Sequence, residues 1–256
     1  MDKQIILEKA KKGRYQRYLS NCYHMDDIDR AEKLWEKGES FVFSYTDHGI
    51  KRLIFSAADW HTVDELLSSI DAGTYYLEYM TKQPQEYVPV HSSLTARMAR
   101  IANADCRSVF DTDSPVLQYQ SHSAGVWAGE EDAGEINRIL WSVFHTEVSH
   151  LLYDDELKEI IQRKQIMIAR ENEQITALLQ AEVLPKKFYI NQIVNRGDRK
   201  IIHGMLLRQL EEYVKAGGKY LYAWVDETNI ASLKFHHKYG MEKDGTYSEI
   251  YCIERP

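Results

Sequence analysis

The clearest pattern of apolar and polar positions lies within residues 188–241. Apolar residues alternate with polar ones over 188–194, which predicts a β-strand. After the turn residues 195–198, apolar residues recur at three- and four-residue spacing, which predicts an amphipathic helix from Arg199 to the glycine pair Gly217-Gly218. These apolar positions are Ile201, Ile202, Met205, Leu206, Leu210, Tyr213 and Val214.

A second strand and a shorter helix complete this segment. Residues 219–225 are rich in Tyr, Leu, Trp and Val, which favour strands, and 230–238 has a helical pattern that ends at Gly240. Strands joined through a helix are parallel, with a right-handed crossover. The pattern therefore predicts a β-α-β unit followed by a helix.

The remaining pattern predicts a mixed α/β (α+β) protein. Helices are expected at 5–18, 25–37, 63–70, 92–104, 130–144 and 154–163, and strands at 41–45, 51–56, 74–80, 116–120, 126–127, 166–170, 174–184 and 247–253. Turn residues centred on Gly49 and Asn172 make 41–56 and 166–184 predicted hairpins. A small-residue stretch at 121–125 is typical of a linker, so two domains are expected, 1–122 and 123–256.

The turn at the start of the long helix has the features of an anion site. Backbone N–H groups at a helix N-terminus have no intrahelical partners, and the helix dipole favours negative charge there. The basic residues Arg196, Arg199, Lys200 and His203 cluster around this turn, which makes phosphate the expected ligand. The alternative is a surface turn with solvated basic side chains.

These residues resemble the GNAT N-acyltransferase superfamily. Residues 194–207 are similar to its pyrophosphate-binding motif Q/R-x-x-G-x-G/A, with Arg199 at the first position and Gly204 at the last, but Ile202 stands in place of the middle glycine. Asn229, Ser232, Phe235, Lys238 and Gly240 follow the spacing of its asparagine-to-glycine segment. The resemblance implies a GNAT-like mixed sheet flanked by helices in the second half of the chain. The first half is faintly similar to a degenerate second copy without a cofactor turn.

The resemblance also implies which residues hold an acyl-CoA. Main-chain groups of Ile193, Val194 and Asn195 would hold the carbonyl and pantetheine, where their strand separates from the next one. The diphosphate would lie on the turn and helix start, and Asn229 and Ser232 would contact the cofactor arm. The diphosphate residues are Arg199, Lys200, Ile201, Ile202, His203 and Gly204. Ile202 either turns its side chain into the core, which leaves the site usable, or closes the site.

Acyl transfer to an amine further requires a base for the amine and an acid for the departing thiolate. His236 stands where the resembled family usually has its acidic tyrosine, and a protonated histidine can donate to a thiolate. A surface histidine is the alternative. Glu182 is the first candidate for the base. Glu171, Glu173 and a water held by Asn191 or Gln192 are the alternatives.

Composition limits the other possibilities. The formal net charge of -7 disfavours a nucleic-acid partner, and the widely spaced Cys22, Cys106 and Cys252 fit a reducing compartment without disulfides. Nothing approaches a transmembrane span or a signal peptide, so a cytoplasmic protein without membrane contact is expected. His145, His150 and Asp154-Asp155 lack firm ligand spacing, so no metal is expected.

The sequence therefore predicts a GNAT-type acyltransferase that uses acetyl-CoA as co-substrate. Its expected partners are acyl-CoA and a small-molecule amine or amino acid acceptor, in a monomer or homodimer. Two alternatives remain: an aminoacyl or long-acyl transferase of the tandem-GNAT type, and a non-catalytic acyl-CoA-binding or regulatory protein that keeps the fold.

Overall fold

The segment with the strongest sequence pattern forms the predicted β-α-β-α arrangement. It consists of β10 (Lys187–Asn195), α5 (Arg199–Lys215), β11 (Tyr220–Asp226) and α6 (Ile230–His237). β10 and β11 are parallel. α5 ends before Gly217, whose φ of +88° lies in the left-handed region that glycine adopts without strain. The computed structural model describes residues 3–84, 87–122 and 125–256.

The chain divides into two compact units, of which unit 2 spans Met98–Gly245. Within it the strands lie in the order β6, β11, β10, β9, β8, β7. Writing η for a 3-10 helix, its other elements are β6 (Ser92–Asn103, which enters this unit at Met98), η2 (Cys106–Phe110), η3 (Leu117–Tyr119), β7 (Val126–Trp127), η4 (Glu130–Asp132), α3 (Ala133–Val143), α4 (Asp154–Gln162), β8 (Ile166–Glu171) and β9 (Gln174–Leu184).

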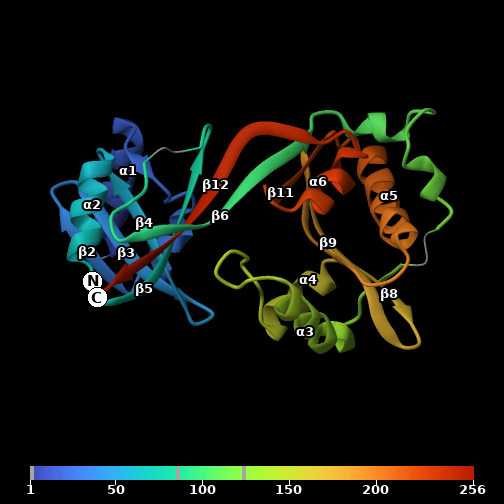
Figure 1. Ribbon diagram of the computed structural model, residues 1–256, viewed down its shortest axis with the longest axis horizontal. Coiled ribbons are helices and arrows are strands. Elements are labelled where there is room, and N and C mark those ends of the chain that lie inside the picture. Colours follow the sequence, from blue (N-terminus) through green and yellow to red (C-terminus); the bar gives the residue numbers. More distant parts are fainter. Residues whose placement is uncertain (1–2, 85–86, 123–124) are drawn as a thin grey trace. The chain divides into compact units, whose positions relative to one another are not determined.

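Helices cover both faces of the unit 2 sheet (Figure 1). On one face, α5 packs Ile202, Met205 and Leu206 against Phe188 and Ala223 of the strands. On the other face, α3 and α4 bury a second apolar cluster. That cluster includes Ile136, Leu140, Leu157, Ile168, Leu178 and Val194. The alternation along each strand thus divides its side chains between two cores.

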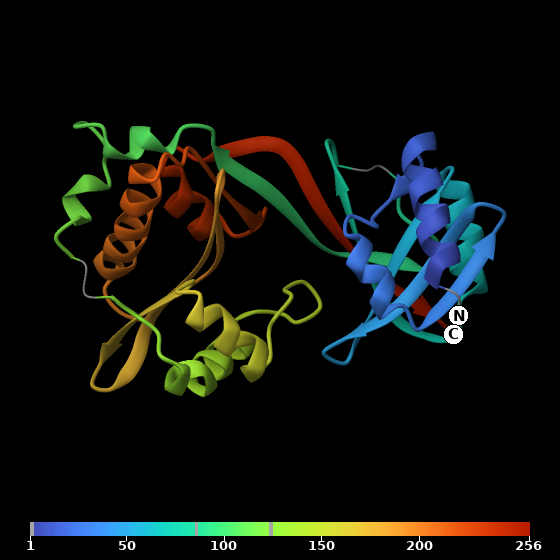
Figure 2. The same ribbon diagram turned by 180° about the vertical axis from the view of Figure 1, so that it is seen from behind.

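Unit 1 contains the chain up to Arg97 together with Thr246–Pro256. Its sheet order is β2, β3, β4, β5, β12, with β1 paired to β4. Helices α1 and α2 lie against separate apolar clusters, and both are visible beside the sheet in Figure 2. The elements are α1 (Lys3–Gln16), β1 (Leu19–Ser20), η1 (Met25–Arg30), β2 (Lys33–Lys37), β3 (Ser40–Asp47), β4 (Ile50–Ala57), α2 (Trp60–Ser69), β5 (Gly73–Thr81) and β12 (Glu242–Arg255).

Three predicted elements are wrong. The expected helix at 25–37 is η1 followed by strand β2, and the expected strand at 116–120 contains the 3-10 turn η3. The expected helix at 92–104 is the strand β6, in which Ala99, Ile101 and Asn103 are buried at alternate positions. Its Ala, Arg and Met residues favour a helix, but pairing with β11 determines the outcome.

The units also divide the chain at positions other than the expected boundary at 122/123. The first division lies between Arg97 and Met98, and Thr246–Pro256, which includes most of β12, is assigned to unit 1, where β12 pairs with β5. Part of the expected linker, residues 123–124, lies outside the described residues. Within the described chain, no helix combines the length and apolar character needed to cross a membrane.

Candidate functional site

Strands β10 and β11 separate partway along their length. They pair from Lys187 opposite Tyr220 as far as Ile190 opposite Ala223, and no later residue of β10 has a partner in β11. Beyond this point β10 continues against β9, after a register shift at Asn191, while β11 continues against β6 as far as Asp226. The edge of β10 that carries Ile193, Val194 and Asn195 therefore faces a gap in the ladder, where main-chain groups are available to a ligand.

Basic side chains surround the turn that follows β10. Arg196, Arg199 and Lys200 are exposed, and the Arg196 guanidinium donates to the Ser142 hydroxyl of α3 at 2.9 Å. The first N–H groups of α5 have no partners four residues earlier in the helix, although the Ile201 N–H donates to the Asp198 carbonyl oxygen at 3.1 Å. The structure thus brings the free edge of β10 and this positive turn together in sequence and space.

Asp198 introduces a negative charge at the same turn. It is the N-cap of α5, and its carboxylate accepts a hydrogen bond from the backbone N–H of Lys200 at 2.9 Å. An N-cap carboxylate satisfies a helix donor and interacts favourably with the dipole. An incoming phosphate must therefore compete with, or displace, the protein's own anion.

Ile202 points away from the exposed side of this turn. Its side chain is buried in the core cluster with Met205 and Leu206. Gly204, two residues further along α5, is also buried. Ile201 is half-buried and packs on the edge of that cluster. The branched side chain that replaces the expected glycine therefore lies in the core, as the helical pattern predicts.

His203 does not supply the positive charge expected of it. Its ring is buried between Tyr119 and Phe235, with ring centroids 4.5 and 4.6 Å away. Its Nδ1 lies 2.8 Å from the Tyr239 hydroxyl. Burial, with a smaller effect of Lys238, lowers the pKa of His203 to about 4. The side chain is a neutral core residue, and only its backbone remains a candidate ligand for phosphate.

His236 is also neutral, which changes its predicted role. Nδ1 donates to the Ser232 carbonyl oxygen at 2.8 Å, which leaves Nε2 as a buried acceptor with no partner among the described residues. Burial lowers the pKa of His236 to about 4. At pH 7 roughly one molecule in a thousand would carry the proton, so the ring is poorly suited to be a general acid.

Asn229 and Ser232 fix the start of α6. The Asn229 side chain accepts a hydrogen bond from the Ser232 N–H at 3.0 Å, as an N-cap. The Ser232 hydroxyl lies 3.3 Å from Nδ1 of His236. Both residues therefore have local roles in α6, and their predicted contact with a cofactor stays a prediction.

Glu182 lies in a row of side chains that crosses the sheet. It is opposite Tyr189 of β10, which is opposite Tyr222 of β11, so the three side chains share one face. The two tyrosine rings stack at 4.8 Å. Burial raises the pKa of Tyr222, and the negative charge of Glu182 raises it further. Trp224, two positions along β11, lies on the same face.

The other candidate bases lie elsewhere or have other contacts. Glu171 and Glu173 are exposed at the β8–β9 turn, and Gln192 is buried on β10. Asn191 is exposed at the register shift, where its side-chain oxygen accepts from the Tyr189 hydroxyl at 3.4 Å. Among the described residues, no group of three His, Cys, Asp or Glu side chains is arranged to hold a metal ion.

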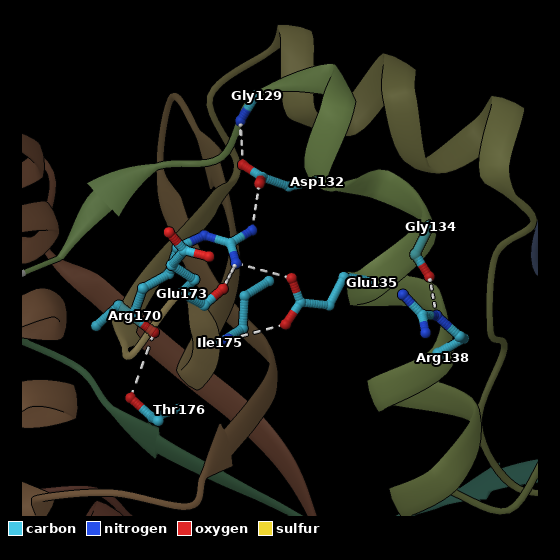
Figure 3. Close-up of polar contacts among 10 residues, drawn as sticks. Gly129, Asp132, Gly134, Glu135, Arg138, Arg170, Glu173, Ile175 and Thr176 are labelled. Atoms are coloured by element: carbon cyan, nitrogen blue, oxygen red, sulfur yellow. Dashed lines mark hydrogen bonds and ion pairs between the residues drawn. The ribbon is translucent and has the colours of Figure 1, made fainter.

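An ion-pair network holds the β8–β9 hairpin against the start of α3 (Figure 3). Arg170 contacts the carboxylates of Asp132 at 2.5 Å and Glu135 at 2.8 Å. Glu135 also accepts from the Ile175 N–H at 2.8 Å. Beyond the separation, β10 is paired with β9 and not with β11. By fixing the β8–β9 hairpin, the network therefore also helps to fix the position of this part of β10.

Two features of the site were not among the sequence-based candidates: the aromatic face, formed by Tyr189, Tyr222 and Trp224, and the N-cap residue Asp198. A signal for the first exists, because Tyr220, Tyr222 and Trp224 alternate with buried residues along β11. Asp198 immediately precedes the predicted helix, which is the N-cap position. Neither signal by itself indicates a ligand.

No known family profile matches the chain, and no curated protein matches its sequence. Solved structures do match its fold. A GCN5-related N-acetyltransferase from Sphaerobacter thermophilus superposes with a TM-score of 0.57 at 12% identity, covering 85% of this chain and 77% of its own. An acetyltransferase of the GNAT family from Novosphingobium aromaticivorans gives a TM-score of 0.53 at 11% identity, covering 90% and 94%.

A tandem GNAT protein from the clavulanic acid biosynthesis pathway also matches, with a TM-score of 0.52 at 11% identity, covering 86% of this chain and 81% of that protein. At such identities the likeness shows the fold alone. The chain therefore has a GNAT-like mixed α/β fold, as the sequence resemblance predicts.

Proposed function

We propose that unit 2 is an acyl-CoA-dependent N-acyltransferase domain that transfers an acyl group, with acetyl as the default, to the amine of a small molecule. The observation that carries this proposal is the separation of β10 and β11 after Ile190 and Ala223. It leaves a free main-chain edge that leads directly to the basic start of α5. The GNAT-like fold of the structural neighbours supports the same reading.

In this proposal the two ends of the cofactor have different partners. The main chain of Ile193, Val194 and Asn195 pairs with the pantetheine in place of the missing strand partner. Arg199 and Lys200, with Arg196, surround the diphosphate, and the backbone at Ile201–Gly204 completes the turn. Asn229 and Ser232 are the proposed contacts to the cofactor arm.

The reaction is a direct transfer in which the protons balance without an acidic histidine. Glu182 accepts a proton from the acceptor ammonium, and the neutral nitrogen attacks the thioester carbonyl carbon. The C–S bond breaks, and the second proton of the attacking nitrogen passes through water to the departing sulfur. His236 offers Nε2 as a hydrogen-bond acceptor, because its buried ring is neutral.

Calorimetry with acetyl-CoA and CoA tests the binding half of the proposal. Micromolar binding is expected, with at least a tenfold loss in the Arg199→Ala/Lys200→Ala protein. Both side chains are exposed, so the variant keeps the core intact. Lys186→Ala/Lys187→Ala is the matched control, since it removes the same charge at the opposite end of β10. Equal affinity in all three proteins, or no binding by any, would contradict the site.

A non-catalytic acyl-CoA-binding protein is the second candidate. Two observations favour it: the Asp198 carboxylate already satisfies the Lys200 N–H, and His236 is neutral. Thiol release from acetyl-CoA with a panel of amines separates the two functions. Binding without thiol release would support the second candidate, and comparing acetyl with longer acyl donors would identify a long-acyl transferase.

We further propose that unit 1 is a GNAT-like partner without a cofactor turn. Its strands β4 and β5 are parallel and joined through α2, in the same manner as β10, α5 and β11. The connection from β4 to α2 is Ala58-Asp59, which contains no glycine and no basic residue. Acyl-CoA should therefore bind once per chain, which the stoichiometry of the calorimetric titration measures.

A further inference from the structure

We infer that the sheet face formed by Glu182, Tyr189, Tyr222 and Trp224 binds the acceptor, and that this acceptor is an aromatic primary amine. This inference rests on the proposed function, because it assigns the second substrate of the same site. The four side chains are all partly exposed. They lie on the face of β9, β10 and β11 opposite Phe188, Ile190 and Ala223, which are buried under α5.

The charge on this face selects a cation. Arg100, opposite Trp224 on β6, is neutralised by Asp244 at 2.7 Å. Glu182 has no hydrogen bond or ion pair with any other described side chain, and it is the negative charge that acts on Tyr222. The cation Lys187 lies on the same face, but two positions from Tyr189 on the side away from Trp224. The charge left for a ligand beside Tyr222 and Trp224 is therefore the Glu182 carboxylate. Tyrosine and tryptophan ring faces also attract ammonium groups. A free carboxylate on the ligand would be repelled, which disfavours amino acids as acceptors.

The rings select a flat group beside that ammonium. Tyr189 and Tyr222 already stack on each other at 4.8 Å. Trp224 lies two residues beyond Tyr222 on β11, past the point where β10 and β11 separate. No ring from β10 therefore stacks on Trp224. The Arg100 guanidinium lies 5.9 Å from the centroid of the Trp224 ring. A ligand ring can take the place that a β10 side chain would fill, and it lies there next to the free edge proposed to hold the thioester.

The spacing of the strands sets the length of the acceptor. Glu182 on β9 and Trp224 on β11 are separated by two inter-strand spacings across the sheet, about 10 Å, and by two residues along the strand, about 7 Å, so their Cα atoms lie roughly 12 Å apart. A ring on Trp224, a two-carbon chain and the reach of the Glu182 side chain together span this distance. The amine nitrogen then lies between the carboxylate and the separation of β10 and β11, where it can lose its proton and attack.

The test compares two amines of matched size, 2-phenylethylamine and 2-cyclohexylethylamine, with phenylalanine, which adds a carboxylate to the first. For the intact protein with acetyl-CoA, kcat/KM should be at least fivefold higher for the aromatic amine than for the cyclohexyl amine. It should be at least tenfold higher than for phenylalanine. Equal values for the three would overturn the inference.

Variants assign the selection to individual side chains. Trp224→Leu should raise KM for 2-phenylethylamine at least tenfold and abolish its advantage over the cyclohexyl amine. Tyr222→Phe, which keeps the ring, should change KM less than threefold, whereas Tyr222→Leu should raise it as Trp224→Leu does. Trp141→Leu, at a partly exposed tryptophan on α3, is the control and should behave as the intact protein. A Trp224→Leu protein with unchanged KM would contradict the assignment.

Direct binding keeps this test separate from that of the proposed function. Titration of CoA by calorimetry reports on the cofactor site, and titration of 2-phenylethylamine, with and without CoA, reports on the aromatic face. If CoA fails to bind but the amine binds and Trp224→Leu abolishes that binding, the transferase proposal fails and the amine site stands. If CoA binds and 2-phenylethylamine binds no better than 2-cyclohexylethylamine, the amine site is wrong and the cofactor site stands.

Discussion

Asp198 accepts a hydrogen bond from the backbone N–H of Lys200 at 2.9 Å, at the point where the proposed diphosphate would meet the helix. The carboxylate therefore stabilises α5 and opposes an anionic ligand at the same time. Both effects come from the helix terminus, where unpaired donors and the dipole attract any negative charge. A substitution at Asp198 that keeps the N-cap hydrogen bond but removes the negative charge can distinguish these two effects.

Replacing Asp198 with Ser should tighten CoA binding. Serine caps helices about as well as aspartate but carries no charge, so α5 should stay formed while an anionic competitor is removed. An effect of roughly three- to fivefold in Kd is expected at low salt, decreasing as salt is added. Asp155→Ser, at the exposed start of α4, removes the same charge and should leave Kd unchanged. Weaker binding by the Asp198→Ser protein would show that the carboxylate assists the cofactor.

Replacing Ile202 with Ala should lower stability without improving the site. The side chain is 2% exposed in the core beneath α5, and truncating a buried isoleucine costs about 2–5 kcal/mol. Urea unfolding measures this loss, and calorimetry should show CoA affinity within twofold of the intact protein. Ile201→Ala, at a half-buried position, should cost less. A tenfold gain in affinity on truncation of Ile202 would mean instead that its side chain closes the turn.

The two buried histidines should make folding stability depend on pH. Burial lowers the pKa of His203 and of His236 from 6.5 to about 4. Between these values the unfolded chain binds more protons than the folded one, so stability is complete above about pH 6.5 and falls as pH drops toward 4. Each ring contributes a slope of up to about 1.4 kcal/mol per pH unit.

Urea titrations from pH 4.5 to 7.5 measure this slope. His203→Gln and His236→Gln should each reduce it, because each removes one proton-binding difference between the folded and unfolded states. His61→Gln, whose side chain is 84% exposed, should leave it unchanged. A flat profile for the intact protein would contradict the buried, neutral state of both rings.

Turnover should rise with pH across the neutral range. The proposed reaction needs a deprotonated amine and no imidazolium, since the His236 pKa lies well below neutrality. At saturating substrates kcat should therefore show no descending limb between pH 6 and 8. A decrease centred near pH 6.5 that disappears in His236→Ala would restore that residue as the acid.

The part of the fold that could be predicted from sequence is the part determined by local pattern. β10, α5, β11 and α6 begin and end within about two residues of expectation because alternation, helical spacing and glycine stops all agree there. β6 was missed because its residues 92–103 favour a helix locally, and its strand state depends on β11, more than a hundred residues away. Long-range pairing of this kind leaves no local signal.

The candidate site shows the same division. The inward direction of Ile202 follows from helical periodicity, and its burial is one of the two alternatives that the sequence leaves open. The neutral state of His203 depends on Tyr119 and Phe235, which come from distant segments. The row of Glu182, Tyr189 and Tyr222 likewise depends on strand register, which the sequence alone does not give.

The pairing of β12 with β5 has a consequence for how the chain is made. Unit 1 needs residues 246–256, which are synthesised only after the whole of unit 2. During translation the first 97 residues therefore emerge with the edge of β5 unpaired, although domains generally fold in the order of their synthesis. An unpaired edge is a template for incorrect association. For this chain, the unit that begins first along the sequence is therefore completed last, after the whole of unit 2.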